Sequence, residues 1–180
     1  MGLNRGAGRI LVEWLVVVAV IAGLSGCHSW GSTAVPRTAD GVRLPAYSRG
    51  VPSLFVPLPE GYRVRRRQSP DFDVYNVTWR GEGVRAEGII NVGRAPRYFY
   101  KRTRGVSDVE PQVTTVGNER VPVYQFVVDG ESHCKEAILT DAFAGAKRAR
   151  VFVHIASFGD DAEQVDAFWG ILTKIRPASR

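Results

Sequence analysis

Short runs in which apolar and polar side chains alternate fill most of the chain after Pro52, and turn residues separate one run from the next. A period of two is typical of half-buried β-strands, because successive side chains on a strand point to opposite faces. The pattern therefore predicts an antiparallel sheet of about seven or eight strands. The predicted strands are residues 54–58, 62–67, 73–79, 84–92, 113–116, 121–128, 133–140 and 150–158.

The last part of the chain departs from this alternation. Residues 151–158, VFVHIASF, are nearly all apolar, so this strand is expected at the centre of the sheet with both faces covered. Residues 161–175 carry apolar side chains at three- and four-residue spacing, which predicts an amphipathic helix with Trp169 in its apolar stripe. Asp160 followed by Glu163 has the form of a helix N-cap with its reciprocal acid. The expected fold class is thus α+β, an antiparallel sheet with a C-terminal helix packed on it.

A second, shorter helix is also compatible with the pattern, at residues 97–105 or 142–148. The order of many strands followed by a C-terminal packing helix resembles PsbP-like domains, several of which occur on bacterial lipoproteins. Residues 51–180 are long enough to form one such domain with its own core, and we expect a single domain there.

The chain begins with an apolar run of a different kind. Residues 14–24, WLVVVAVIAGL, are all apolar or small, and Arg5 and Arg9 precede them with one acid, Glu13. A secretory signal typically has a positively charged N-terminal region, then an apolar run of about 7 to 15 residues, and then small residues. A membrane-spanning helix is the alternative, but it would have to include the Glu13 carboxylate to approach a spanning length. We therefore expect a signal peptide at residues 1–26.

The tetrapeptide LSGC at residues 24–27 resembles the lipobox of bacterial lipoproteins. The resemblance implies that the Cys27 thiol is alkylated with a diacylglycerol, that the signal is cut before it and that the new amino terminus is acylated. The protein would then be anchored to the inner or outer membrane, with its domain on the periplasmic or extracellular side. A chance cysteine beside an ordinary signal is the alternative. Residues 28–50 show no sustained period, so we expect residues 27–50 to form the lipidated cysteine and a flexible tether.

The mature chain is positively charged. The sequence holds 24 basic and 18 acidic side chains, and without residues 1–26 it keeps 22 and 17, a net charge of +5. Nucleic acid is a poor partner outside the cytoplasm. Besides the bilayer that receives the acyl anchor, we expect either a protein partner or an anionic envelope component such as lipid headgroups or cell-wall polymer. If Cys27 is lipidated, Cys134 has no partner within the chain, so no internal disulfide is expected.

Residues 94–104, RAPRYFYKRTR, interleave three aromatic with five basic side chains. Tyr and Arg are residue types that often dominate interface energy, so this segment is the candidate binding surface. Its candidate residues are Arg97, Tyr98, Phe99, Tyr100 and Arg102. The alternatives are rings laid among lipid headgroups, and an ordinary solvated loop with one or two rings in the core. Arg63 with residues 65–67 forms a second basic group, on one or both faces of a strand edge.

Few other residues suggest chemistry. Cys134 is a candidate nucleophile with His154 as its base if the register of two consecutive strands brings them together, and a buried structural thiol is the alternative. Asp71 and Asp73 would share a strand face as a carboxylate pair, although such pairs at a strand start are usually solvated. His133 and Cys134 are adjacent on a strand and point to opposite faces, so we expect no metal site, and no cofactor is expected either.

The sequence contains no recognisable catalytic constellation, which favours a role in binding over catalysis. The expected function is a membrane-anchored envelope lipoprotein that acts as a non-catalytic binding or interaction module. Examples are an inhibitor, an immunity-type partner of a secreted enzyme, or an accessory subunit of an envelope complex. The alternatives are an envelope enzyme that uses Cys134 or the carboxylates, and a carrier that holds an apolar ligand between sheet and helix.

Overall fold

The computed structural model describes residues 31–48, 51–79, 86–94, 96–106, 109–140 and 151–178. Gly31–Arg180 form one compact unit. The predicted signal peptide, Cys27 and the shorter helix considered at residues 142–148 lie outside the described residues.

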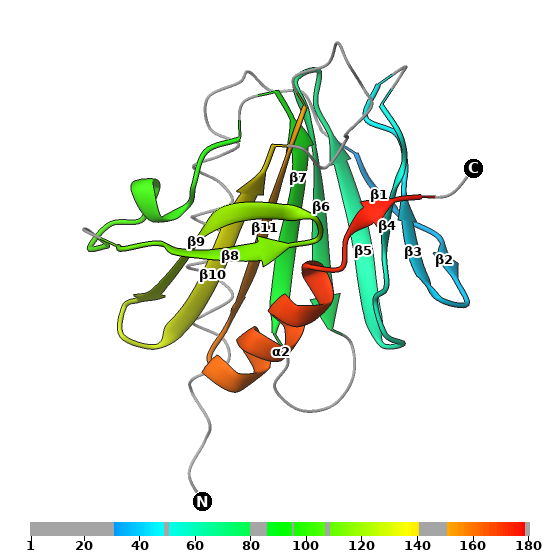
Figure 1. Cartoon of the computed structure of the whole chain (residues 1–180). Coiled ribbons are helices and arrows are strands. Elements are labelled where there is room, and N and C mark those ends of the chain that lie inside the picture. Colours follow the sequence, from blue (N-terminus) through cyan, green and yellow to red (C-terminus); the bar gives the residue numbers. More distant parts are fainter. Residues whose placement is uncertain are drawn as a thin grey trace, which may run out of the picture. The chain divides into compact units, whose positions relative to one another are not determined.

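The larger sheet of the described chain has eight strands, and every neighbouring pair is antiparallel. These strands are β1 (Ser32–Ala34), β5 (Tyr62–Gln68), β6 (Phe72–Trp79), β7 (Glu87–Gly93), β8 (Gln112–Val116), β9 (Glu119–Val128), β10 (Ser132–Leu139) and β11 (Phe152–Gly159). Their order across the sheet is β1-β5-β6-β7-β11-β10-β9-β8 (Figure 1). The apolar strand β11 lies between β7 and β10, so the predicted α+β class and the central place of this strand are both confirmed.

A second, smaller sheet was not predicted. Its strands are β2 (Arg37–Thr38), β3 (Gly41–Leu44), β4 (Leu54–Val56) and β12 (Arg176–Pro177), in the order β12-β4-β3-β2. The strand predicted at residues 54–58 therefore belongs to this sheet and not to the larger one.

The prediction of a flexible tether at residues 27–50 is wrong for residues 31–48. Strands β1, β2 and β3 occupy this stretch, and Val42 and Leu44 are fully buried. The strands β1 and β2 are only two or three residues long, and all their side chains are exposed. Pairing with β5 holds β1, and pairing with the neighbouring β3 holds β2. Strands this short and this exposed have no side-chain period that could be recognised in the sequence.

The C-terminal helix α2 (Ala162–Leu172) starts one residue later than predicted. Its N-cap is Asp161, whose Oδ1 accepts the N–H groups of Glu163 at 2.9 Å and Gln164 at 3.1 Å. An aspartate reaches these two amides only from the position immediately before the helix, which is why Asp161 and not Asp160 caps it.

Close packing of α2 on the sheet depends on a glycine. Phe168 is 1% exposed, and its ring stacks on Tyr62 with 4.7 Å between the centroids. A Cβ atom placed on Gly88 of β7 would lie 2.8 Å from the Phe168 ring and 2.6 Å from the carbonyl oxygen of Ala156. Any larger residue at position 88 would therefore push the helix off the sheet.

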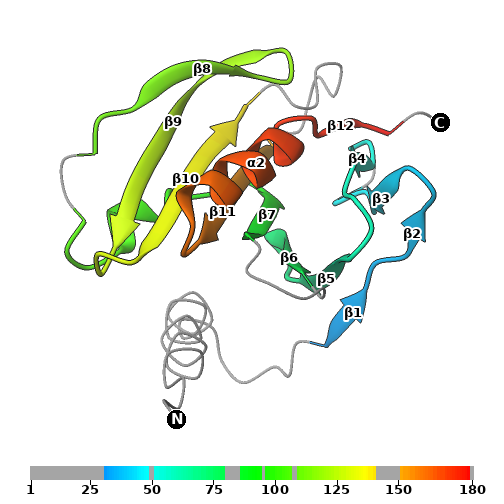
Figure 2. The ribbon, with the colours of Figure 1, turned by 90° about the horizontal axis from the view of Figure 1, so that it is seen from below.

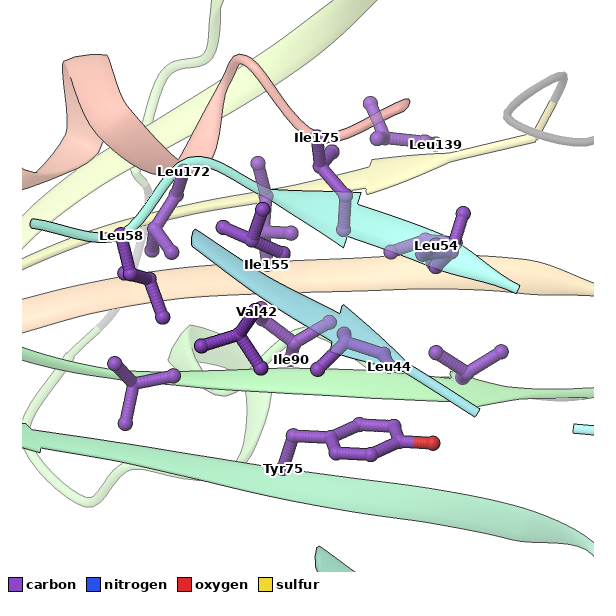
Figure 3. Packing of buried hydrophobic residues seen from close by; sticks show 14 of the residues in the cluster. Val42, Leu44, Leu54, Leu58, Tyr75, Ile90, Leu139, Ile155, Leu172 and Ile175 are labelled. Atoms are coloured by element: carbon purple, nitrogen blue, oxygen red, sulfur yellow. The ribbon is translucent and has the colours of Figure 1, made fainter. Parts of the chain in front are cut away.

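Strand register divides the larger sheet into two faces. On the inner face Tyr75, Ile90 and Ile155 stand opposite one another on β6, β7 and β11, and they pack with Val42 and Leu172 in the core (Figure 3). Figure 2 shows α2 and the smaller sheet on this same side. The opposite, outer face carries the alternate residues. One row across it consists of Arg65, Asn76, Ile89, Ala156, Glu136 and Tyr124.

Candidate functional site

A buried carboxylate on the outer face holds the predicted binding segment in place. Glu136 of β10 is fully buried, and its two oxygens accept the backbone N–H groups of Phe99 at 2.8 Å and Tyr100 at 2.9 Å. Tyr100 begins the short 3₁₀ helix η1 (Tyr100–Arg102), which is the helical element within residues 97–105, where a second helix was considered. The carboxylate thus satisfies donors that a helix start leaves unpaired.

His154 completes this anchor. Its Nε2 lies 2.7 Å from Glu136 Oε2, and its side chain is 1% exposed. The other ring nitrogen, Nδ1, is buried and has no hydrogen-bond partner among the described residues, and the same is true of Oδ1 of Asn91, which stands opposite His154 on β7. A histidine beside a carboxylate is an arrangement that general bases use, but here neither side chain reaches solvent. The pair therefore acts as a structural anchor for the segment above it.

The three rings of the segment pack down on the sheet. Tyr98 lies 4.6 Å and Tyr100 4.3 Å from Tyr124 between ring centroids, and Phe99 lies 4.5 Å from His154. All three are half-buried. Burial, with smaller contributions from Tyr124 and Glu136, raises the pKa of Tyr98 to about 12, so this phenol stays neutral at physiological pH. The rings fasten the segment and leave only part of their surface for a partner.

The five basic side chains of the segment differ from its rings in burial, and Lys101 Nζ lies 5.8 Å from the centroid of the Tyr100 ring. All five are exposed, and none takes part in an ion pair with another described residue. They are Arg94, Arg97, Lys101, Arg102 and Arg104, named here the basic segment. The structure therefore separates the candidate binding residues into a half-buried aromatic set and an exposed cationic set.

The second basic group is divided between the two faces of β5. Arg63 and Arg65 are exposed and Arg67 is half-buried, and alternation along the strand places all three on the outer face. We call these three residues the arginine row. Arg66 points to the inner face instead, where its Nη2 donates to Oδ2 of Asp73 at 2.7 Å.

The two carboxylates of the predicted Asp71 and Asp73 pair have different settings. Asp73 is fully buried and also accepts the Tyr75 hydroxyl at 3.3 Å, whereas Asp71 is exposed. Burial and the neighbouring Asp73 raise the pKa of Tyr75, which keeps that hydroxyl a donor. Asp73 is therefore engaged in the structure of the fold.

Cys134 and His154 do not meet. Register places Cys134 opposite Phe158, while His154 stands opposite Ile138. The two residues therefore lie four positions apart along the strands, which corresponds to about 13 Å. The thiol is 3% exposed, and burial, with a smaller contribution from Glu136, raises its pKa well above the ordinary value. A neutral, enclosed thiol is a poor nucleophile, so the structural alternative describes this residue.

The described residues offer little else for chemistry. They contain no group of three or more His, Cys, Asp or Glu side chains that could share a metal ion. A surface depression of about 420 Å³ lies beside the smaller sheet, lined by residues 37–40 and 57–60. Arg37 in its wall is already bound to the carbonyl oxygens of Leu58 at 2.7 Å and Tyr62 at 3.1 Å.

Comparison with known proteins gave no relative: no protein family, curated protein or solved structure matches this chain. The resemblances to bacterial lipoproteins and to PsbP-like domains therefore stay predictions. Within the described residues no helix is long and apolar enough to cross a bilayer.

Sequence reasoning found the segment but missed the residues that position it. Glu136 lies 37 positions from Phe99, and Tyr124 lies 24 positions from Tyr100, each on a separate strand. The available signal was a carboxylate inside the otherwise largely apolar strand CKEAIL, since a buried acid requires donors nearby.

Proposed function

We propose that this protein is a lipid-anchored lipoprotein of the cell envelope that acts without catalysis, by binding an anionic partner through the basic segment. One observation carries the proposal: five exposed cations stand on a segment that two backbone hydrogen bonds to the buried Glu136 hold in one conformation. A surface that is ordered before it binds loses less conformational entropy on binding, so it binds more tightly than a loose basic loop.

The alternatives receive less support. The thiol of Cys134 is buried and lies far from His154, which disfavours an enzyme that uses this pair. The space between α2 and the sheet is occupied by Phe168, Leu172 and Ile155, which disfavours a carrier of an apolar ligand there. Binding at the surface is the function that agrees best with this geometry.

The anchor is tested by intact mass. We expect the mature protein isolated from membranes to begin at Cys27 and to carry the added mass of acyl chains. Cys27→Ser should lose that mass and either leave the membrane fraction or remain an unprocessed precursor. The matched control is Cys134→Ala, which should stay lipidated. An unmodified wild-type chain that begins at another residue would contradict the proposed anchor.

The binding surface is tested by charge removal. The double variant Arg97→Gln, Arg102→Gln should capture roughly tenfold less of the anionic partner from detergent-solubilised envelope, because two exposed charge contacts contribute about 1 kcal/mol or somewhat more together. The captured protein or lipid is quantified by mass spectrometry. Arg43→Gln with Arg176→Gln on the smaller sheet is the matched control for lost charge, and Cys134→Ala should also bind normally. Equal capture by both double variants would exclude the basic segment.

A further inference from the structure

We propose that the outer face of the larger sheet docks on the anionic headgroups of the bilayer that holds Cys27. The arginine row and the basic segment are the two contact regions. This inference rests on the proposed lipid anchor and names the ligand of the proposed binding surface.

The chain between the anchor and the fold is short. Ser32 is the first residue of β1, so only residues 28–31 separate it from Cys27. Five residue steps span at most about 18 Å, even when fully extended. The tether expected from the sequence, by contrast, would have had 23 residues. Once Cys27 is lipidated, covalent length alone keeps β1 near the headgroups.

The strand nearest the anchor lies against the arginine row. In the register of β1 with β5, Ser32 stands opposite Arg67 and Ala34 opposite Arg65. Neighbouring strands are about 4.8 Å apart, so the guanidinium groups that start on β5 are within reach of any surface that β1 approaches. All three side chains of β1 are exposed and add no acid to this edge.

The basic segment occupies the other end of the same face. The row that begins at Arg65 passes through Ala156 to Glu136, and Glu136 holds the backbone of Phe99 and Tyr100. Four strand spacings, about 19 Å, separate β5 from β10. One face therefore carries positive charge at both ends.

Among the described strand residues, two acids lie on the outer face. Alternation along β7 and β10 places Glu87 and Glu136 on the outer face. Glu136 is enclosed and already accepts two backbone amides, and burial raises the pKa of the half-buried Glu87. Basic side chains near an anionic leaflet are attracted over about one Debye length, ~8 Å at physiological ionic strength. The link to Cys27, at most about 18 Å long when fully extended, allows the arginine row to come within that distance.

A lipid surface suits this face better than an acidic protein does. Specific protein interfaces usually have a well-packed apolar centre with few charges. Here the rings of Tyr98, Phe99 and Tyr100 are half-buried against Tyr124 and His154, and the exposed side chains among the described residues of the segment are its five bases. A headgroup layer needs fixed cations and no matching apolar surface.

Arginine footprinting tests the docking on the mature lipidated protein. The protein is reconstituted into vesicles of phosphatidylcholine alone and into vesicles that also contain phosphatidylglycerol, and phenylglyoxal labelling is read by peptide mass spectrometry. On anionic vesicles we expect labelling of Arg65, Arg67, Arg97 and Arg102 to slow about fivefold, as a headgroup contact of ordinary strength implies. About 1 M salt should remove this protection, because the Debye length then falls to ~3 Å.

Internal controls and a variant make the outcome decisive. Arg43 and Arg176 on the smaller sheet should label equally on both vesicle types. The triple variant Arg63→Gln, Arg65→Gln, Arg67→Gln should lose most of the protection of Arg97 and Arg102. Equal labelling on both vesicles, or protection that appears only after an envelope protein is added, would overturn the docking. Flotation with neutral vesicles reports the acyl anchor separately, so failure of the anchor and failure of the docking are distinguishable.

Discussion

We expect Glu136→Ala to lower the free energy of unfolding by about 3–5 kcal/mol, the range for removing one partner of a buried, hydrogen-bonded charge. The substitution leaves the N–H groups of Phe99 and Tyr100 without their acceptor and the buried Nε2 of His154 without its partner. Each buried donor that loses its partner costs about 1–3 kcal/mol. Chemical denaturation followed by circular dichroism measures the loss.

A second measurement separates loss of the anchor from general damage. Amide hydrogen exchange at Phe99 and Tyr100 should speed up more than exchange in β11, because the segment is released before the sheet opens. Glu131→Ala, at an exposed position in the β9-β10 turn, is the matched control and should change stability by less than about 0.5 kcal/mol. Unchanged exchange at Phe99 and Tyr100 in Glu136→Ala would show that the carboxylate does not hold the segment.

Phe168→Ala should also lower the free energy of unfolding by about 3–5 kcal/mol, because it removes a large, fully buried aromatic ring. The ring fills the space between α2 and the sheet, stacks on Tyr62 and lies directly over the position of Gly88. The helix cannot move inward to close the cavity, because it already approaches the sheet as closely as a glycine permits. The midpoint of urea unfolding provides the value.

The control for Phe168 lies on the same helix. Glu163 is exposed in the first turn, so Glu163→Ala should have only a small effect. A loss below about 1 kcal/mol for Phe168→Ala would mean that α2 is peripheral to the core.

Elements with a long side-chain pattern were predictable from the sequence. The strands β5, β6, β9, β10 and β11 were located within one or two residues, because each alternates over at least seven positions or is apolar throughout. The helix α2 was located for the same reason, through its apolar stripe. Its N-cap was misplaced by one residue, and its end was predicted at residue 175, whereas the helix ends at Leu172. β1, β2 and β12 were missed because two or three exposed residues carry no period, and their strand conformation exists only through hydrogen bonds to another strand.

For the candidate site, the sequence located the basic and aromatic residues, and only the structure decided how they are arranged. Local alternation determines which residues can form strands and which can form a helix, since it depends only on neighbours along the chain. Strand register is a non-local property, and it places Cys134 four positions along the strands from His154. The pairing of Arg66 with Asp73 on the inner face, away from the arginine row, also became visible only in the structure. Glu136 meets Phe99 across 37 positions of sequence, so its role as an anchor followed from the packing of distant segments and from the need of a buried carboxylate for donors.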